Sequence, residues 1–232
     1  ALGGLFVAVI APIIFSDYVE LHAGLVAAVF LVFLALLEDR GLARRLPRNS
    51  WRGAAVAGAI LVLVAGWFFG RMAVSTEYGV FYRHRNFYGV LKLKRQGLPL
   101  GARNMRYTLL HDGIIHGSQY QSMPRRVKPI SYYGKKSGIG ILMRNYRQEQ
   151  SRHVGVLGLG VGTMAAYGDS DDTFRFYEIN PAVARVARKY FTYLEDSPAR
   201  CRVVMGDARL SLAEEKSLQF DVLVMDVFRG DA

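Results

Sequence analysis

Residues 154–163 read VGVLGLGVGT, and this stretch decides the fold class of the chain. Gly158, Gly160 and Gly162 are spaced by two, and they lie between a strand-like segment and a predicted helix at 162–167. Glycines in that context let the backbone approach a ligand and let the helix pack closely on a sheet. A tight turn can show the same pattern, so its meaning depends on the segments that follow.

Strands and helices alternate along the rest of the chain. Strand-like segments at 173–177, 202–205 and 220–225 are interspersed with helix-like segments at 181–191 and 208–215. The first of these helices opens with an asparagine and a proline, which favour the N-cap and the first helical position. Regular alternation of this kind predicts an α/β fold with a parallel, doubly wound sheet.

Acidic residues follow the predicted strands. Glu178 ends the second strand, about 20 residues after the glycines, where a carboxylate accepts both hydroxyls of a ribose. Asp207 and Ala208 follow the third strand, where an acid typically receives the exocyclic amine of an adenine. Asp226 ends the fourth strand, and it is interpreted either as a turn aspartate or as a catalytic acid or base. Because the carboxyl ends of parallel strands share one edge of a sheet, these residues predict a nucleoside site.

The amino-terminal part is almost purely apolar. Apolar runs occupy residues 2–15, 24–37 and 53–70. A membrane-spanning helix needs about 20 apolar residues, with about 17 near the lower limit, so the third run qualifies and the second does when extended to 22–38. The first run is interpreted as the end of a truncated span. A signal peptide is the alternative, but the run has no basic region before it and further apolar runs follow.

The formal net charge is +11, and much of the basic charge flanks the apolar runs. Arginines are dense at 38–52, and Arg71 follows the third run directly. Membrane-flanking charge accounts for this distribution, and no nucleic-acid motif is present, so the expected partner is a lipid bilayer. Basic residues on both sides of the third run leave the membrane side of the following domain open. The single cysteine and the scattered histidines predict neither a disulfide nor a metal site.

The middle of the chain has the period of strands. Residues 87–94 and 106–111 partly alternate between apolar and polar side chains, and Asp112 and Gly113 follow as a hairpin turn. This pattern predicts a small antiparallel β region.

The expected organisation has three parts. Transmembrane helices that form a partial bundle occupy 1–72, a small antiparallel β domain occupies 73–134, and a nucleoside-binding domain occupies 135–232. The chain starts inside an apolar run and stops soon after a predicted strand. Both ends therefore read as cuts in a longer protein, and the parallel sheet is expected to be incomplete at its carboxyl end. The expected location is the cell (inner) membrane, crossed more than once.

Several stretches between residues 74 and 232 resemble the spermidine synthase (aminopropyltransferase) family, and more closely its membrane-fused bacterial branch. In that branch, transporter-like spans precede a spermidine-synthase-like domain. The stretches are RNFYGVLK at 85–92, HDGIIHGSQ at 111–119, SYYGKKSG at 131–138, VLGLGVG at 156–162, FYEINP at 176–181, GDAR at 206–209 and DVFRGD at 226–231. The resemblance implies a small β domain before a methyltransferase-like Rossmann sheet.

The resemblance also implies an activity. A diamine such as putrescine attacks the aminopropyl carbon of decarboxylated S-adenosylmethionine, and methylthioadenosine leaves. By position, the glycine-rich loop and Glu178 would hold the nucleoside, and Asp207 would bind the adenine. Asp226 matches the aspartate that orients and deprotonates the amine. A homodimer is compatible with the resemblance.

Other positions match the family or depart from it. Tyr132 and Tyr133 fall where the family lines the substrate site with a tyrosine, and Asp231 matches a second amine-binding acid at a longer spacing. Val161 replaces an aspartate that holds the aminopropyl ammonium, and Arg229 lies in a segment that is shorter in the family. Two alternatives therefore stay open. One is a methyltransferase that uses S-adenosylmethionine itself, and the other is a non-catalytic polyamine or nucleoside sensor domain of a transporter.

Overall fold

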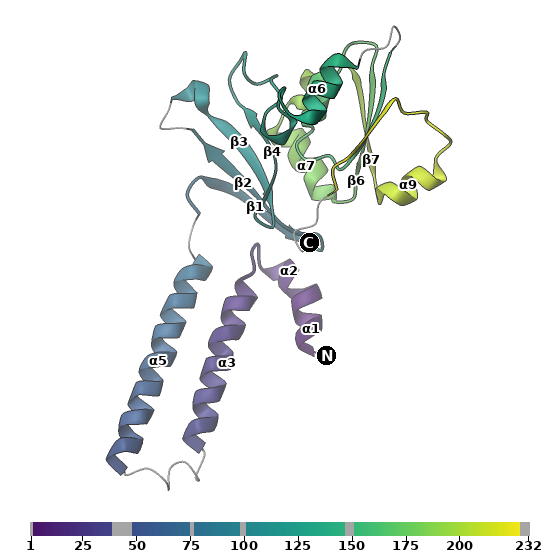
Figure 1. The fold of residues 1–232 in the computed structure, drawn as a ribbon. Helices are drawn as coiled ribbons and strands as arrows, with labels where there is room; N and C mark the ends of the chain where they lie inside the picture. The colour runs from purple at the N-terminus through teal and green to yellow at the C-terminus, as the bar shows by residue number, and fades with distance from the viewer. Residues whose placement is uncertain (1, 39–47, 75–76, 98–100, 147–150, 228–232) are drawn as a thin grey trace. The chain divides into compact units, whose positions relative to one another are not determined.

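The computed structural model of the chain describes residues 2–38, 48–74, 77–97, 101–146 and 151–227 (Figure 1). The chain divides into two compact units, Ala1–Glu77 and Tyr78–Ala232. Among the residues that the structure describes, the first unit contains helices and the second contains the strands.

The first unit consists of apolar helices. The segment predicted at 2–15 forms α1 (Leu2–Leu5), the π-helical turn η1 (Phe6–Ile10) and α2 (Ala11–Ile14). The other two apolar runs are confirmed as helices, within α3 (Val19–Glu38) and α5 (Arg48–Val74).

The helices α3 and α5 lie side by side (Figure 1). Gly58 faces the ring of Phe33, because a Cβ at Gly58 would lie 2.7 Å from Phe33 Cε2. By length and composition Val19–Glu38 and Ser50–Met72 could cross a membrane, and none of the residues in the two apolar windows is buried. Core helices of soluble proteins and signal sequences can share that length and composition.

The antiparallel β region predicted from the sequence is present in the second unit. Its strands are β1 (Val80–Asn86), β2 (Gly89–Gln96), β3 (Arg106–His111) and β4 (Ile114–Tyr120), in the order β1-β2-β3-β4. The predicted hairpin turn connects β3 to β4, and its two residues have φ angles of 49° and 86°. Positive φ at both central positions is the signature of the turn that matches strand twist, which is why an Asp-Gly pair occurs there.

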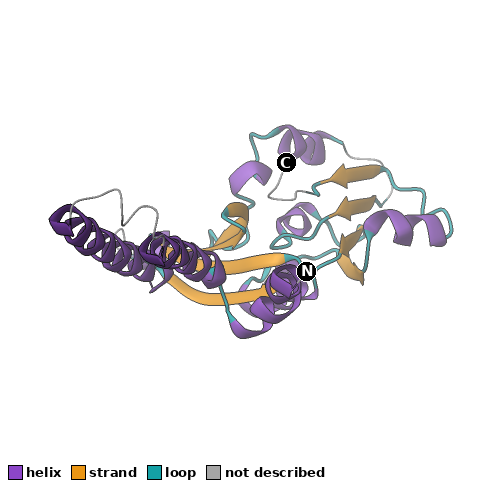
Figure 2. Cartoon of the chain, turned by 90° about the horizontal axis from the view of Figure 1, so that it is seen from below, coloured by secondary structure: helices purple, strands orange, loops and turns teal. Residues whose placement is uncertain are grey.

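The parallel sheet is also present. It consists of β5 (His153–Leu157), β6 (Thr173–Glu178), β7 (Arg200–Met205) and β8 (Val222–Met225), in the order β7-β6-β5-β8. The chain moves outward from β5 to β7 and then returns to the other side of β5, so the winding direction reverses between β5 and β8. Open α/β sheets bind ligands at such a switch point, beyond the carboxyl ends of the strands. In Figure 2 the two sheets form separate groups of orange strands.

Helices cover both faces of the parallel sheet. Figure 1 shows α7 (Pro181–Tyr190) and α9 (Ala208–Glu214) on opposite sides of it. The predicted cap of α7 is confirmed, because the Asn180 side chain accepts a hydrogen bond from Ala182 N. Shorter segments are η3 (Ala102–Asn104), η4 (Ser131–Tyr133), α6 (Gly138–Asn145), η5 (Thr163–Tyr167) and α8 (Tyr193–Asp196).

The segment after the glycine-rich loop differs from the prediction. A helix was expected at 162–167, and the structure has the 3-10 helix η5 there instead. The segment stops at Gly168, where a Cβ would lie 2.5 Å from Ala199 Cβ and 2.9 Å from the Phe174 ring. The bounds therefore agree closely with the prediction, and the difference is the type of helix.

The two sheets share one core. Leu91 and Leu109 of the antiparallel sheet belong to the same buried cluster as Val154 and Phe174 of the parallel sheet. A part-buried polar pair adds to this contact. Thr192 N donates to Gln119 Oε1 and Gln119 Nε2 donates to Thr192 Oγ1, both at 2.9 Å. Strand β4 is therefore held in a fixed position beside the parallel sheet.

Arg152, directly before β5, makes a buried ion pair. Its Nε and Nη2 donate to both carboxylate oxygens of Asp172, and the two side chains are 3% and 5% exposed. Arg152 Nη1 also donates to Met143 O, and Nη2 donates to Tyr167 O, each at 2.9 Å. One guanidinium therefore joins α6, η5 and the turn before β6.

Candidate functional site

Two glycines bring the loop after β5 against neighbouring backbone. Gly158 and Gly160 have φ angles of 91° and 53°, in the region that favours glycine. A Cβ at Gly158 would overlap the carbonyl oxygen of Asp226, and one at Gly160 would lie 2.5 Å from His116 O. The loop is therefore wedged between the segment after β8 and strand β4, and side chains at these positions would force the three segments apart.

Glu178 at the end of β6 fixes the same loop from the other side. It is 8% exposed, its Oε2 accepts from Leu159 N at 3.1 Å, and its Oε1 accepts from Asn180 N at 2.8 Å. Burial raises the pKa of the Glu178 carboxyl, and the backbone N–H groups of Asn180 and Leu159 limit the rise. Each carboxylate oxygen has a second lone pair, so Glu178 can hold the loop and accept ribose hydroxyls together.

Asp226 follows β8 and meets both predicted tyrosines. Tyr133 Oη donates to Asp226 Oδ2 at 2.5 Å, and Tyr132 Oη donates to the same oxygen at 3.2 Å. Burial and the Asp226 carboxylate raise the pKa of both tyrosine hydroxyls, so they stay protonated donors at neutral pH. This arrangement orients a carboxylate at the switch point between β5 and β8.

The remaining predicted residues lie further along the edge or outside the described part. Asp207 is exposed after β7 and caps α9, with Leu210 N donating to its Oδ1 at 3.0 Å, and Ala208 is the first residue of that helix. Asp231 lies outside the described residues. The strand order places Asp207, Glu178, the glycine-rich loop and Asp226 in that sequence along one edge of the sheet.

A histidine that the sequence interpretation left unassigned also reaches this edge. Strand β4 contains a β-bulge, because Gly117 pairs with Leu109 while Ile115 pairs with Leu110. His116 is the additional residue between them, and its ring centroid lies 5.3 Å from that of His111. Bulges occur frequently next to active sites, where they redirect a side chain.

A glycine inside a strand was the signal for this bulge. Gly117 has a φ of 132°, and a Cβ there would lie 2.5 Å from Val161 Cγ2. Val161 itself is 2% exposed and belongs to the hydrophobic core. Val161, which the resemblance to spermidine synthases aligns with an aspartate, is thus a side chain of the hydrophobic core.

The charge environment of His116 combines opposing effects. Burial lowers the pKa of its imidazole, and the neighbouring His111 lowers it further. The carboxylates of Asp226 and Asp112 act in the opposite direction, but the net pKa stays below the ordinary value of 6.5. His116 is therefore neutral at pH 7, within electrostatic reach of Asp226.

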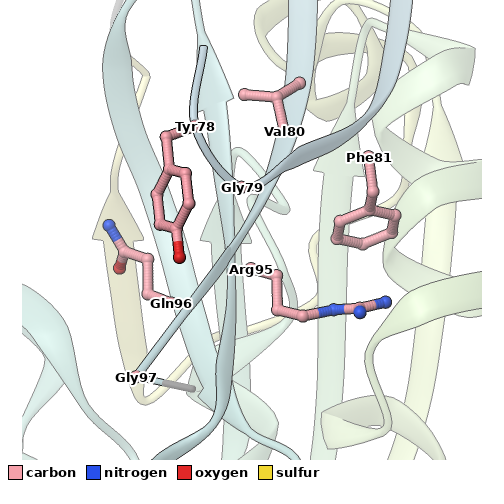
Figure 3. A pocket seen from close by; sticks show the side chains of 7 residues that line it. All are labelled: Tyr78, Gly79, Val80, Phe81, Arg95, Gln96 and Gly97. Carbon is pink, nitrogen blue, oxygen red and sulfur yellow. The ribbon is translucent and has the colours of Figure 1, made fainter. Parts of the chain in front are cut away.

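A hollow of about 240 Å³ lies elsewhere on the second unit (Figure 3). Arg95 lies there with its guanidinium 5.4 Å from the Phe81 ring centroid. The register pairs Leu91 with His111 and Gln96 with Arg106, so this hollow is at the opposite end of the antiparallel sheet from the His111 turn. Its lining residues are Tyr78, Gly79, Val80, Phe81, Arg95, Gln96 and Gly97.

Comparison with known proteins gives two similar solved structures. No family model and no curated protein matches the chain. A probable spermidine synthase from Corynebacterium glutamicum is 19% identical with a TM-score of 0.48, over 67% of this chain and 54% of that one. A spermidine synthase from Thermotoga maritima is 18% identical with a TM-score of 0.44, over 63% of this chain and 46% of that one. The chain thus spans about half the length of each, and the function proposed for it rests on its own site.

Proposed function

We propose that the chain is an aminopropyltransferase that moves the aminopropyl group of decarboxylated S-adenosylmethionine to a diamine such as putrescine. The observation that carries the proposal is the carboxylate of Asp226, which two tyrosine hydroxyls hold at the switch point of the sheet. The glycine-rich loop and the buried carboxylate of Glu178 lie on the same edge. This edge combines groups suited to a nucleoside with an acceptor suited to an amine.

The residues have separate roles in this reaction. The glycine-rich loop and Glu178 hold the nucleoside of the donor, and Asp207 receives its adenine. Asp226 attracts the cationic diamine, orients it and draws a proton from the attacking nitrogen. The new N–C bond forms as the C–S bond breaks, and the electron pair of that bond remains on sulfur in neutral methylthioadenosine. Holding the attacking nitrogen in line with the C–S bond of the sulfonium lowers the activation barrier by about 7–11 kcal/mol.

We further propose that α3 and α5 attach the enzyme to the cell membrane as a multi-pass protein. Their support is length, apolar composition and the exposure of their side chains. The proposed acceptor is a diamine or polyamine.

A methyltransferase that uses S-adenosylmethionine itself is the second candidate. The observation that favours it is the burial of Val161, which leaves the glycine-rich loop without an acidic side chain at that position. An ammonium group of the donor therefore gains no charge partner from Val161. The two candidates differ in the donor that binds and in the group that is transferred.

Calorimetry with the protein in detergent micelles tests the proposal. We expect decarboxylated S-adenosylmethionine to bind more tightly than the intact compound, and mass spectrometry to detect spermidine when putrescine is added. Tighter binding of intact S-adenosylmethionine, with methylation of an acceptor, would instead establish the methyltransferase. Binding of a donor without any transfer would leave the sensor interpretation.

Glu178→Gln is expected to weaken donor binding by about 1–3 kcal/mol, because a charged hydrogen-bond acceptor is lost. The glutamine has one acceptor oxygen, whereas Glu178 uses two for Leu159 N and Asn180 N. Calorimetry measures the effect, and a thermal melt checks that the fold persists. The matched control is Glu195→Gln on the exposed face of α8, which should bind donor normally. Unchanged affinity in Glu178→Gln would show that the ribose is held elsewhere.

A further inference from the structure

We propose that Tyr167 is a positioning residue for the transfer, because its hydroxyl ties the tyrosines that hold Asp226 to the segment directly after the glycine-rich loop. The inference rests on the function proposed above and adds a residue to it. Tyr167 is the last residue of η5, and its Oη donates to Tyr133 O at 2.6 Å. This hydrogen bond joins η5 to η4 across 34 positions of the chain.

The backbone of η5 is itself held firmly. Arg152 Nη2 donates to Tyr167 O at 2.9 Å, and Ser197 Oγ donates to Ala165 O at 2.7 Å. Met164 and Ala165 are fully buried in the hydrophobic core. The position of the Tyr167 hydroxyl is therefore set by the same core that supports the glycine-rich loop.

The structure also leaves room for this hydroxyl. Gly140 is buried in α6, and a Cβ there would lie 2.7 Å from Tyr167 Oη and would overlap Gly134 O. Alanine is ordinarily the better residue inside a helix, so the glycine is explained by the close approach of the hydroxyl and the turn. Burial raises the pKa of the Tyr167 hydroxyl, against an opposite effect of Arg144, so the group is a protonated donor at neutral pH.

Tyr133 connects this contact to the reacting groups. It is 7% exposed, and its Oη donates to Asp226 Oδ2 at 2.5 Å, while Tyr132 Oη donates to the same oxygen at 3.2 Å. Because η4 is only three residues long and contains both tyrosines, a shift of its backbone moves both hydroxyls together. Tyr167 therefore acts on the Asp226 carboxylate through Tyr133, and the carboxylate in turn orients the amine.

Tyr167→Phe tests the role, because it removes the hydroxyl and keeps the ring. We expect kcat/KM for putrescine to fall by about 10- to 10²-fold, since displacement of a reacting group by about 1 Å can cost about 10²-fold. Donor affinity, measured by calorimetry on the same preparation, should be unchanged, because Glu178 and Asp207 are left in place. A folded Tyr167→Phe protein with an unchanged kcat/KM would overturn the inference.

Tyr193→Phe is the matched control. Tyr193 is 1% exposed, and its Oη donates to Lys128 O at 2.9 Å and to Ser118 O at 3.1 Å, so this variant also loses a buried hydroxyl that holds backbone carbonyls. It should lower the melting temperature at least as much as Tyr167→Phe does, yet keep the normal kcat/KM. If activity instead falls in proportion to stability in both variants, Tyr167 has only a structural role.

A double variant tests whether Tyr167 acts through Tyr133. Residues that act through one another show strongly non-additive effects, whereas independent residues give losses that multiply. Tyr133→Phe combined with Tyr167→Phe should therefore lose far less activity than the product of the two single losses. Losses that multiply would overturn the inference while leaving the proposed function intact. Absence of product from the unaltered protein with either donor overturns the proposed function, and this inference with it.

Discussion

Asp226→Asn is expected to slow diamine turnover on the order of 10²–10⁴-fold, which is the contribution of a lost general base. Asparagine keeps the size of the side chain and still accepts a hydrogen bond from Tyr132 or Tyr133, but it has neither the negative charge nor the proton affinity. Donor affinity should be unchanged, because the residues proposed to contact the nucleoside follow β5, β6 and β7, whereas Asp226 follows β8.

Rate and donor affinity must be measured on the same preparation. Product is quantified from putrescine by mass spectrometry, and donor binding is followed by calorimetry. Asp171→Asn, in the exposed turn before β6, is the control and should retain full activity. If Asp226→Asn binds donor and turns over at the normal rate, another group deprotonates the amine.

Asp172→Ala should destabilise the protein by about 3–5 kcal/mol, as removal of one partner of a buried ion pair does. The Arg152 side chain, which is 3% exposed in the unaltered protein, would lose its principal anion. Asp169 also contacts Arg152 Nη2 at 3.2 Å, but its side chain is 59% exposed, so it compensates only in part. Thermal and urea unfolding measure the loss, and Asp171→Ala next to it should change stability by less than about 0.5 kcal/mol.

The contribution of Asp172 to the free energy of unfolding should also depend on pH. Burial by itself raises the pKa of the carboxyl, but the hydrogen bonds from Arg152 and from backbone N–H groups outweigh it, so the pKa lies below the ordinary 3.8. A depressed pKa contributes stability above the unfolded value, and the contribution is lost as the pH falls through the folded value. The stability difference between the unaltered protein and Asp172→Ala should therefore narrow below pH 3.8. A difference that stays constant into that range would contradict the ion-pair explanation.

The position of the strand ends at one edge of the sheet was predictable from the sequence. The alternation of strand-like and helix-like segments indicates a parallel sheet, and the carboxyl ends of parallel strands lie on one side. The glycines at 158–162, Glu178 and Asp226 therefore reach one edge, as their positions after strands indicate. The Asp112–Gly113 hairpin was also predictable, since that dipeptide favours two positive φ angles. These features depend on residues close to one another in the chain.

The features that could not be predicted depend on distant residues. The bulge at His116 is defined by pairing with Leu109 and Leu110, and a single sequence does not contain that register. The packing of Gly168, directly after η5, against Ala199 and Phe174 joins residues that are distant in the chain. The partnership of Arg152 with Asp172 requires the start of β5 to lie beside the turn before β6.

The Arg152 ion pair reaches the site through a chain of contacts. Arg152 holds the carbonyl of Tyr167, the hydroxyl of Tyr167 donates to Tyr133 O at 2.6 Å, and the hydroxyl of Tyr133 orients Asp226. A substitution at Arg152, at the base of β5, is therefore expected to abolish the proposed activity although Arg152 lies away from the site residues. In a mutational screen scored only by product, Arg152 would be grouped with Asp226. Measuring the amount of folded protein and donor binding as well as product would separate them. Arg152 variants should yield less folded protein, whereas Asp226 variants should fold and bind donor but form no product.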